Sequence, residues 1–147
     1  MRDHRTLPAF QHVHELVLAV HEAVGKVPGG EASALAARME SAAHSAAAAI
    51  ARACAVPAEQ LGGQLDEASR RLREVGYYID IAQRLGYLPL DSAVELLERQ
   101  THAGMEVSAM SPEDGGGSAR RPMPGNGAQD SDTSDLAAAV LASLSAR

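Results

Sequence analysis

Residues 41–55, SAAHSAAAAIARACA, contain nine alanines and one large aliphatic side chain, Ile50. Alanine loses no side-chain entropy when a helix forms, so this stretch predicts a helix. Its small side chains bury little apolar area, but they allow neighbouring helix axes to approach closely. We therefore expect this helix at the crowded centre of a bundle, or where two subunits press together. A GC-rich genome is an alternative source of the alanines.

Glycine and proline divide the chain around this stretch into four helical segments. They are expected at Pro8–Gly25, Glu31–Ala55, Pro57–Leu85 and Pro89–Ser111. In the first and third segments apolar residues recur at steps of three and four, which indicates one buried stripe on each of these helices. Short connections between helices of similar length favour an all-α, up-down-up-down four-helix bundle.

The third and fourth segments also predict particular contacts. Two pairs in the third segment, Glu67–Arg71 and Asp66–Arg70, place an acid four residues before a base, which favours ion pairing along the helix. The fourth segment carries the apolar residues Val94, Leu97, Met105 and Met110.

The composition changes after the fourth segment. Residues 112–133 are rich in Gly, Pro and small polar residues and cannot bury enough apolar area to offset ordering, so we expect a disordered linker. The chain then divides into an N-terminal arm at 1–8, the bundle at 9–111, this linker, and a short C-terminal helix at 134–147.

The expected C-terminal helix, SDLAAAVLASLSAR, is amphipathic. Its apolar face consists of Leu136, Val140, Leu141 and Leu144. A helix of this length is marginal in water by itself. It is therefore either a frayed tail or a docking helix, tethered by a linker that raises its effective concentration near a partner. Such terminal helices are similar to the encapsulation tags that load cargo into protein shells.

Charge and cysteine content limit the classes of function. The net charge is −6 at pH 7, and residues 10–111 hold 8 Lys and Arg against 13 Asp and Glu. Phosphate binding needs cationic neutralisation, so this balance disfavours nucleic acid. One cysteine excludes an internal disulfide framework. With no long apolar run and no secretory apolar segment, we expect a soluble cytoplasmic protein that does not enter membranes.

Three stretches together resemble a known family: FQHVHELVLAVHEAVGKVP, LAARMESAAHSAAAAIA and RRLREVGYYIDIAQRLGYL. They are similar to successive signatures of the four-helix bundle protein family, which includes the proteins encoded in ribosomal RNA intervening sequences. The accessory variability determinant of diversity-generating retroelements is structurally similar. The likeness covers about residues 9–110, and its most specific part is the turn at Ile81–Leu88.

The resemblance implies a homopentameric ring of bundles without enzymatic activity. The retroelement members bind a reverse transcriptase and nucleic acid through a basic surface. This chain departs from that pattern in two ways. Where the second helix of the family commonly reads S-I-P-x-N-I-A-E-G, Ala49 replaces the Asn and Arg52 replaces the acidic residue. The chain is also acidic where the family is usually basic, and both departures weaken a nucleic-acid function.

Residues of the third segment are the candidates for nucleic-acid contact. Phosphate contacts would come from Arg70, Arg71, Arg73 and Arg84. The alternative is a solvated face on which these arginines pair with neighbouring acids. Tyr77 and Tyr78 are candidates for stacking on bases, or for anchoring the bundle or a subunit contact.

Six histidines and one cysteine are candidates for metal binding and for thiol chemistry. His14 and His21 share a helical face but lie about 10.5 Å apart along the axis, too far to share an ion. Glu40 and His44 are four residues apart, but the Glu-x-x-His pairs of di-iron bundles are absent. We expect solvated or capping histidines and no metal or cofactor. Cys54 lies about 15 Å along the helix from His44, so we interpret it as a small apolar residue.

The sequence thus predicts a non-enzymatic homo-oligomer, pentameric by resemblance, that acts as an assembly or adaptor protein. It would dock through several C-terminal helices on a larger partner, such as a shell protein. The alternative is a nucleic-acid-binding accessory protein of a reverse transcriptase or retroelement.

Overall fold

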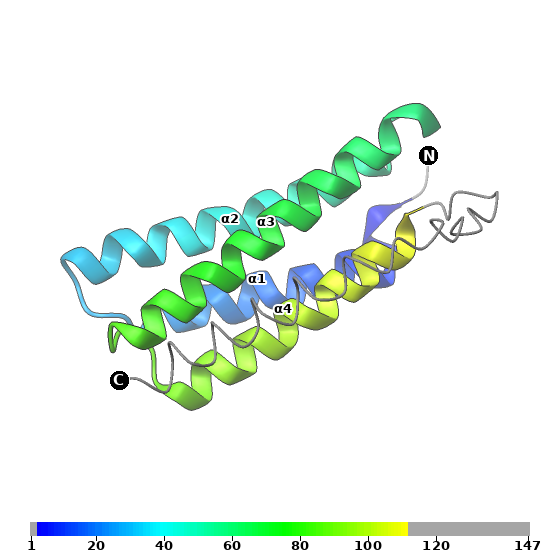
Figure 1. Ribbon diagram of the computed structural model, residues 1–147. Helices are drawn as coiled ribbons and strands as arrows, with labels where there is room; N and C mark the ends of the chain where they lie inside the picture. The colour runs from blue at the N-terminus through cyan, green and yellow to red at the C-terminus, as the bar shows by residue number, and fades with distance from the viewer. Residues whose placement is uncertain (1–2, 112–147) are drawn as a thin grey trace, which may run out of the picture. The chain divides into compact units, whose positions relative to one another are not determined.

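The computed structural model describes residues 3–111 as helices joined by short connections (Figure 1). The elements are a short 3-10 helix η1 (His4–Thr6), then α1 (Pro8–Val24), α2 (Glu31–Ala53), α3 (Ala58–Arg84) and α4 (Leu90–Met110). The all-helical class with four helices is therefore confirmed. The predicted linker at 112–133 and the predicted helix at 134–147, with its four-residue apolar face, lie outside the described residues.

The helix ends follow from proline and glycine. Pro8 is the first residue of α1, and Pro57 and Pro89 directly precede α3 and α4. After α3, Gly86 adopts φ 78°, and the next residue, Tyr87, donates its N–H to the carbonyl of Ala82 at 2.8 Å. This Schellman arrangement favours glycine because the left-handed conformation is strained for other residues.

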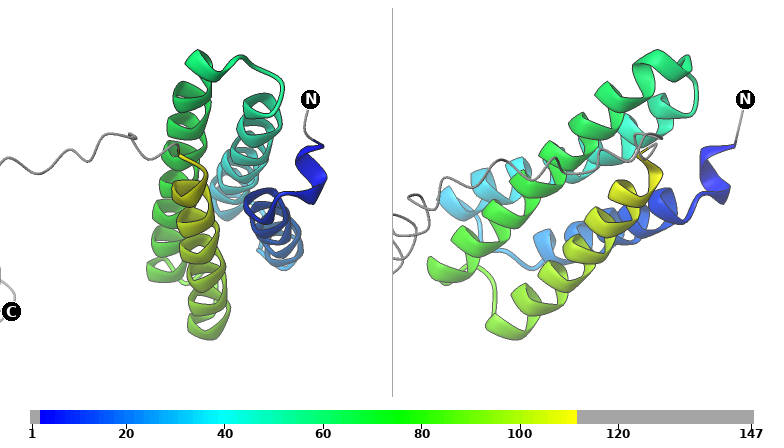
Figure 2. Two further views of the ribbon diagram at one scale, coloured as in Figure 1. Left: turned by 90° about the vertical axis from the view of Figure 1, so that its right-hand side faces the viewer. Right: turned by 45° about the vertical axis from the view of Figure 1, so that its right-hand side comes forward.

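Each helix packs beside two others. Helix α2 contacts α1 and α3, and α4 contacts α1 and α3, so the four helices form a closed ring of neighbours (Figure 2). Short connections place consecutive helices side by side. No helix within residues 3–111 has the length and apolarity that crossing a bilayer requires.

The core combines aliphatic side chains with the alanines of α2. The largest fully buried aliphatic and methionine side chains come from all four helices: Val13, Leu16, Val20, Met39, Ile50, Leu65, Leu72, Val75, Ile79 and Val107. Between them, Ala43, Ala46 and Ala49 of α2 expose no surface. These alanines are buried within one chain, so close packing of α2 at the centre of its own bundle accounts for them.

The N-terminal residues lie against the start of α1. The Asp3 carboxylate accepts a hydrogen bond from the Arg5 N–H at 3.0 Å, which caps η1. The His4 ring then meets the Phe10 ring edge to face, with 4.6 Å between the ring centroids. The arm therefore contacts the first turn of α1.

Candidate functional site

Helix α4 carries apolar residues on two faces. The inner face is buried and consists of Ala93, Leu96, Ala103 and Val107. The outer stripe, as we name it, consists of Leu90, Val94, Leu97, Thr101 and Met105. Of these, Leu90 is 65% exposed, Val94 46% and Met105 64%. An exposed row of large apolar groups on a bundle surface is typical of a site for protein contact.

Of the four apolar residues that the sequence analysis named on this helix, Val94 and Met105 face outward. Leu97 and Met110 are only partly buried against the core. The bundle instead buries two alanines, Ala93 and Ala103, together with Leu96 and Val107. Steps of 3, 4, 3 and 4 from Ala93 to Val107, passing through Gln100, were the signal that identifies the inner face.

Two shallow hollows adjoin the outer stripe, and both include Thr101 and Met105. The first, of about 520 Å³, is also bordered by Val94, Leu97, Glu98 and His102. The second, of about 510 Å³, runs between α3 and α4 and is also lined by Ser69, Leu72, Arg73, Gln100, Gly104 and Ser108. The second hollow is thus a shallow groove between α3 and α4, and Thr101 and Met105 border both hollows.

The two edges of the outer stripe differ in charge. All four acids of α4 lie on the side facing α1, since the 100° turn per residue places them about 80–160° round from Leu90. We call them the acidic edge: Asp91, Glu95, Glu98 and Glu106. Arg99 partly neutralises it, with Nη2 3.3 Å from Glu95 Oε1 and Nη1 3.9 Å from Glu15 Oε2. The α3 side of the groove instead holds Arg73.

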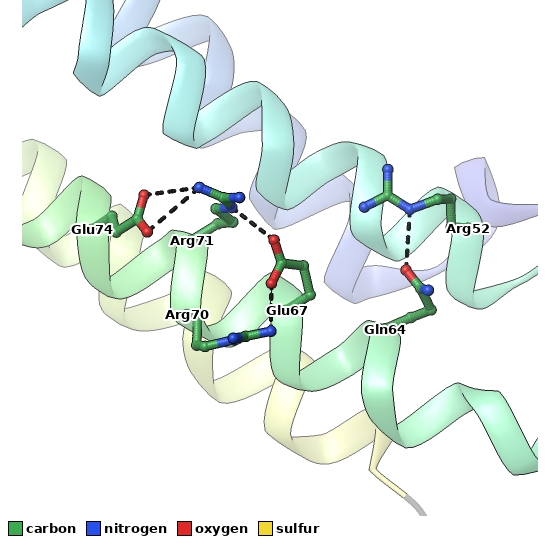
Figure 3. Close-up of polar contacts among 6 residues, drawn as sticks. All are labelled: Arg52, Gln64, Glu67, Arg70, Arg71 and Glu74. Atoms are coloured by element: carbon green, nitrogen blue, oxygen red, sulfur yellow. Dashed lines mark hydrogen bonds and ion pairs between the residues drawn. The ribbon is translucent and has the colours of Figure 1, made fainter.

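The arginines predicted to contact phosphate are mostly engaged by acids of the same helix (Figure 3). Glu67 accepts from Arg71 Nε at 2.8 Å and from Arg70 Nη2 at 2.6 Å, while Arg71 also reaches Glu74. The predicted Glu67–Arg71 pair is thus confirmed. The predicted Asp66–Arg70 pair is wrong, because the Arg70 side chain turns to Glu67, three residues back.

Glu67 is the centre of this network. The hydrogen bond from Arg71 and the positive charges of Arg71, Arg70 and Arg52 together lower the pKa of the Glu67 carboxyl, against a smaller opposing effect of burial. In return, hydrogen bonds to Glu67 and Glu74 raise the pKa of Arg71. The network therefore holds both ions charged at neutral pH.

The other two predicted arginines lie apart from this network. Arg84 Nε is 3.0 Å from Asp80 Oδ2 in the last turns of α3. Arg73 is exposed, forms no ion pair with any residue of 3–111, and borders the groove beside α4. The four arginines therefore do not form one continuous positive surface, because Glu67, Glu74 and Asp80 lie among them.

The tyrosines have different environments. Tyr77 is 62% exposed, whereas Tyr78 is partly buried and packs against the core. Their ring centroids lie 5.7 Å apart at an interplanar angle of 59°. Tyr78 therefore anchors α3, as one of the two predicted roles requires.

Histidine side chains form contacts between helices in two places. Glu40 of α2 meets His21 of α1, with Oε1 and Nδ1 2.5 Å apart, and His44 Nε2 lies 3.8 Å from the same oxygen. Between α1 and α4, the His12 and His102 rings stack with centroids 6.0 Å apart. In neither place, nor elsewhere in the part of the chain that the structure describes, are three His, Cys, Asp or Glu side chains arranged to hold a metal ion.

Cys54 follows the last residue of α2 and is half-buried. Its N–H donates to the carbonyl of Ile50 at 3.3 Å, so its backbone completes the last turn. His44 lies ten residues earlier on the same helix and is directed to Glu40.

No family model matches this chain, and no characterised protein matches its sequence. The resemblance to the four-helix bundle protein family therefore rests on the quoted stretches alone.

Proposed function

We propose that this protein is a non-enzymatic assembly or adaptor module that acts through protein contacts. The outer stripe of α4 carries this proposal, because three of the six large hydrophobic side chains exposed within residues 3–111 lie together on it. Exposed apolar rows of this kind mark interaction surfaces.

The proposal includes self-association. The resemblance carried by the sequence adds a homo-oligomer, pentameric in the related proteins, and several copies would present several C-terminal segments at 134–147. Weak docking by Leu136, Val140, Leu141 and Leu144 of each copy on a larger partner, such as a shell protein, would then be strengthened by multivalency.

The nucleic-acid alternative has less support. Arg70, Arg71 and Arg84 already pair with acids, so a phosphate would have to compete with carboxylates that lie within 2.6–3.0 Å. The net negative charge of the chain further disfavours binding of a polyanion. Of the four predicted arginines, only Arg73 is without an acid partner in the described part of the chain.

Deletion of residues 134–147 tests the adaptor function. The tagged full chain and the deletion variant are compared for the proteins they retain from the native source. We expect the retention of partner proteins to be lost. The circular dichroism of the bundle and the number of copies in the oligomer, measured by light scattering, should stay unchanged. Equal retention by both chains would exclude docking through this segment.

A salt titration against structured RNA separates the two functions. The adaptor proposal expects no binding even at low salt. Binding that weakens steeply with salt would instead indicate several phosphate contacts and favour the alternative.

A further inference from the structure

We infer that the outer stripe of α4 receives an amphipathic helix from a partner protein, and that lysine or arginine residues border the apolar face of that helix. This inference rests on the proposed adaptor function and adds the chemistry of the partner. It concerns α4 and is independent of the segment at 134–147.

The length and spacing of the stripe fit a helix. From Leu90 to Met105 the stripe extends about 22 Å along α4, given 1.5 Å of rise per residue. Its members follow one another at steps of 4, 3, 4 and 4. A partner helix of roughly four turns covers this length if its anchors at i, i+3, i+4 and i+7 repeat over two successive heptads.

The side chains of the stripe suit such a contact. Leu90 and Met105 project at its two ends, and Leu97 is partly buried between them. The Thr101 hydroxyl donates to the Leu97 carbonyl at 2.9 Å, so its polar group is satisfied within α4. Met105 borders both hollows, and its flexible thioether adapts to different apolar partners.

The charges select a basic partner. Asp91, Glu98 and Glu106 on the acidic edge form no ion pair with any residue of 3–111, and Glu95 shares Arg99 with Glu15. A helix lying on the stripe places its own edge residues over these carboxylates, where positive charges speed association and fix orientation. Arg73 on the opposite edge favours an acid on the other side of the same helix.

Charge also argues against two other occupants. A second copy packed antiparallel through the same stripe would bring the two acidic edges together, and like charges repel. The segment at 134–147 contains one acid and one base, Asp135 and Arg147, so it has no basic edge to match.

Two synthetic peptides test the inference against the full chain. Both are 18-residue amphipathic helices with leucines at i, i+3, i+4 and i+7 spacing. One carries lysines along one edge of the leucine face, and the other carries glutamates at the same positions. Fluorescence anisotropy of the labelled peptides gives the affinities. We expect the lysine peptide to bind at least tenfold more tightly, with an affinity that falls as salt is added.

Surface variants locate the site. Val94→Ser with Met105→Ser should weaken binding of the lysine peptide at least tenfold, and Glu98→Lys should weaken it severalfold. Leu18→Ser, which removes another exposed leucine on α1, and Glu31→Lys, which reverses a charge on α2, are the matched controls and should change nothing. Circular dichroism verifies that every variant is folded.

Two results would overturn the inference. One is an equal affinity for the two peptides, or an affinity for the lysine peptide that the Val94→Ser, Met105→Ser variant leaves unchanged. The other is a concentration-dependent oligomer of the full chain that the Val94→Ser, Met105→Ser variant dissociates, which would assign the stripe to a second copy. Partner retention that depends on 134–147 would still stand in either case, so the adaptor function and this inference fail separately.

Discussion

The side-chain amide of Gln100 on α4 donates a hydrogen bond through Nε2 to the main-chain carbonyl of Leu72 on α3, 3.1 Å away. The contact lies beside Gly76, where an added Cβ would approach Gln100 Cδ and Nε2 to 3.3 Å. Glycine at this position thus makes room for a polar link between two helices.

A double-mutant cycle between Gly76 and Gln100 should show strong coupling. Gly76→Ala favours the helix by about 1 kcal/mol, but it displaces the Gln100 amide, whose hydrogen bond contributes about 1 kcal/mol. We expect the free energy of unfolding to stay nearly unchanged in the natural chain and to rise by about 1 kcal/mol in the Gln100→Ala background. Urea unfolding followed by circular dichroism measures all four corners. The same effect in both backgrounds would mean that the amide and the Cβ do not compete.

Enlarging a buried alanine of α2 should destabilise the bundle. Ala46 exposes no surface, so Ala46→Leu forces neighbouring side chains out of place at a cost of roughly 1–3 kcal/mol. Ala48 is exposed on the same helix, and Ala48→Leu should change the free energy of unfolding by less than about 0.5 kcal/mol. Thermal unfolding compares the two variants. Equal effects would show that α2 is not closely packed at Ala46.

The Glu67 network predicts a particular pH dependence. The pKa of Glu67 is lower in the folded chain than in the unfolded chain, so its stabilising contribution is complete above the unfolded pKa. That contribution is lost as the pH falls through the lower, folded pKa. Glu67→Gln should therefore lower the unfolding temperature at pH 7, and the difference from the natural chain should shrink in acid.

The matched control for this series is Asp66→Asn, which removes the neighbouring exposed carboxylate. Its unfolding temperature should follow that of the natural chain more closely at every pH. If the two variants behave alike, the interaction with Arg71 and Arg70 does not stabilise the fold.

Removal of metal ions should leave the protein unchanged. Glu40 is already engaged by His21, and within the described residues no third ligand completes a site around it. Treatment with EDTA should therefore leave the unfolding temperature as it was. A drop of several degrees, restored by one metal added back, would contradict this and direct attention to Glu40.

The helix bounds were predictable because their determinants are local. Each helix start and end that the sequence indicated lies within about two residues of the observed one. Proline cannot continue a preceding helix, which fixes the starts at Pro8, Pro57 and Pro89, and Gly86 adopts the left-handed conformation that ends α3. The burial of the alanines in α2 was likewise expected at the centre of a bundle.

The orientation of α4 was not predictable from bulk alone. Val94 and Met105 are large and apolar, but their size does not indicate which face of the helix is buried. The bundle instead buries the face that combines Ala93 and Ala103 with Leu96 and Val107. Side-chain partners within α3 were also uncertain, since Arg70 reaches acids at either three or four residues and the sequence does not choose between them.

The two apolar faces of α4 make its rotation about its own axis ambiguous. The faces lie about 120° apart, given 100° per residue, so a turn of one third would bring the outer stripe into the core in place of the inner face. Gln100 resolves the ambiguity, because only one orientation gives its amide the Leu72 carbonyl as acceptor. The side chain of Gln100 thus selects one of two helix orientations of similar hydrophobicity. In doing so it leaves the outer stripe exposed.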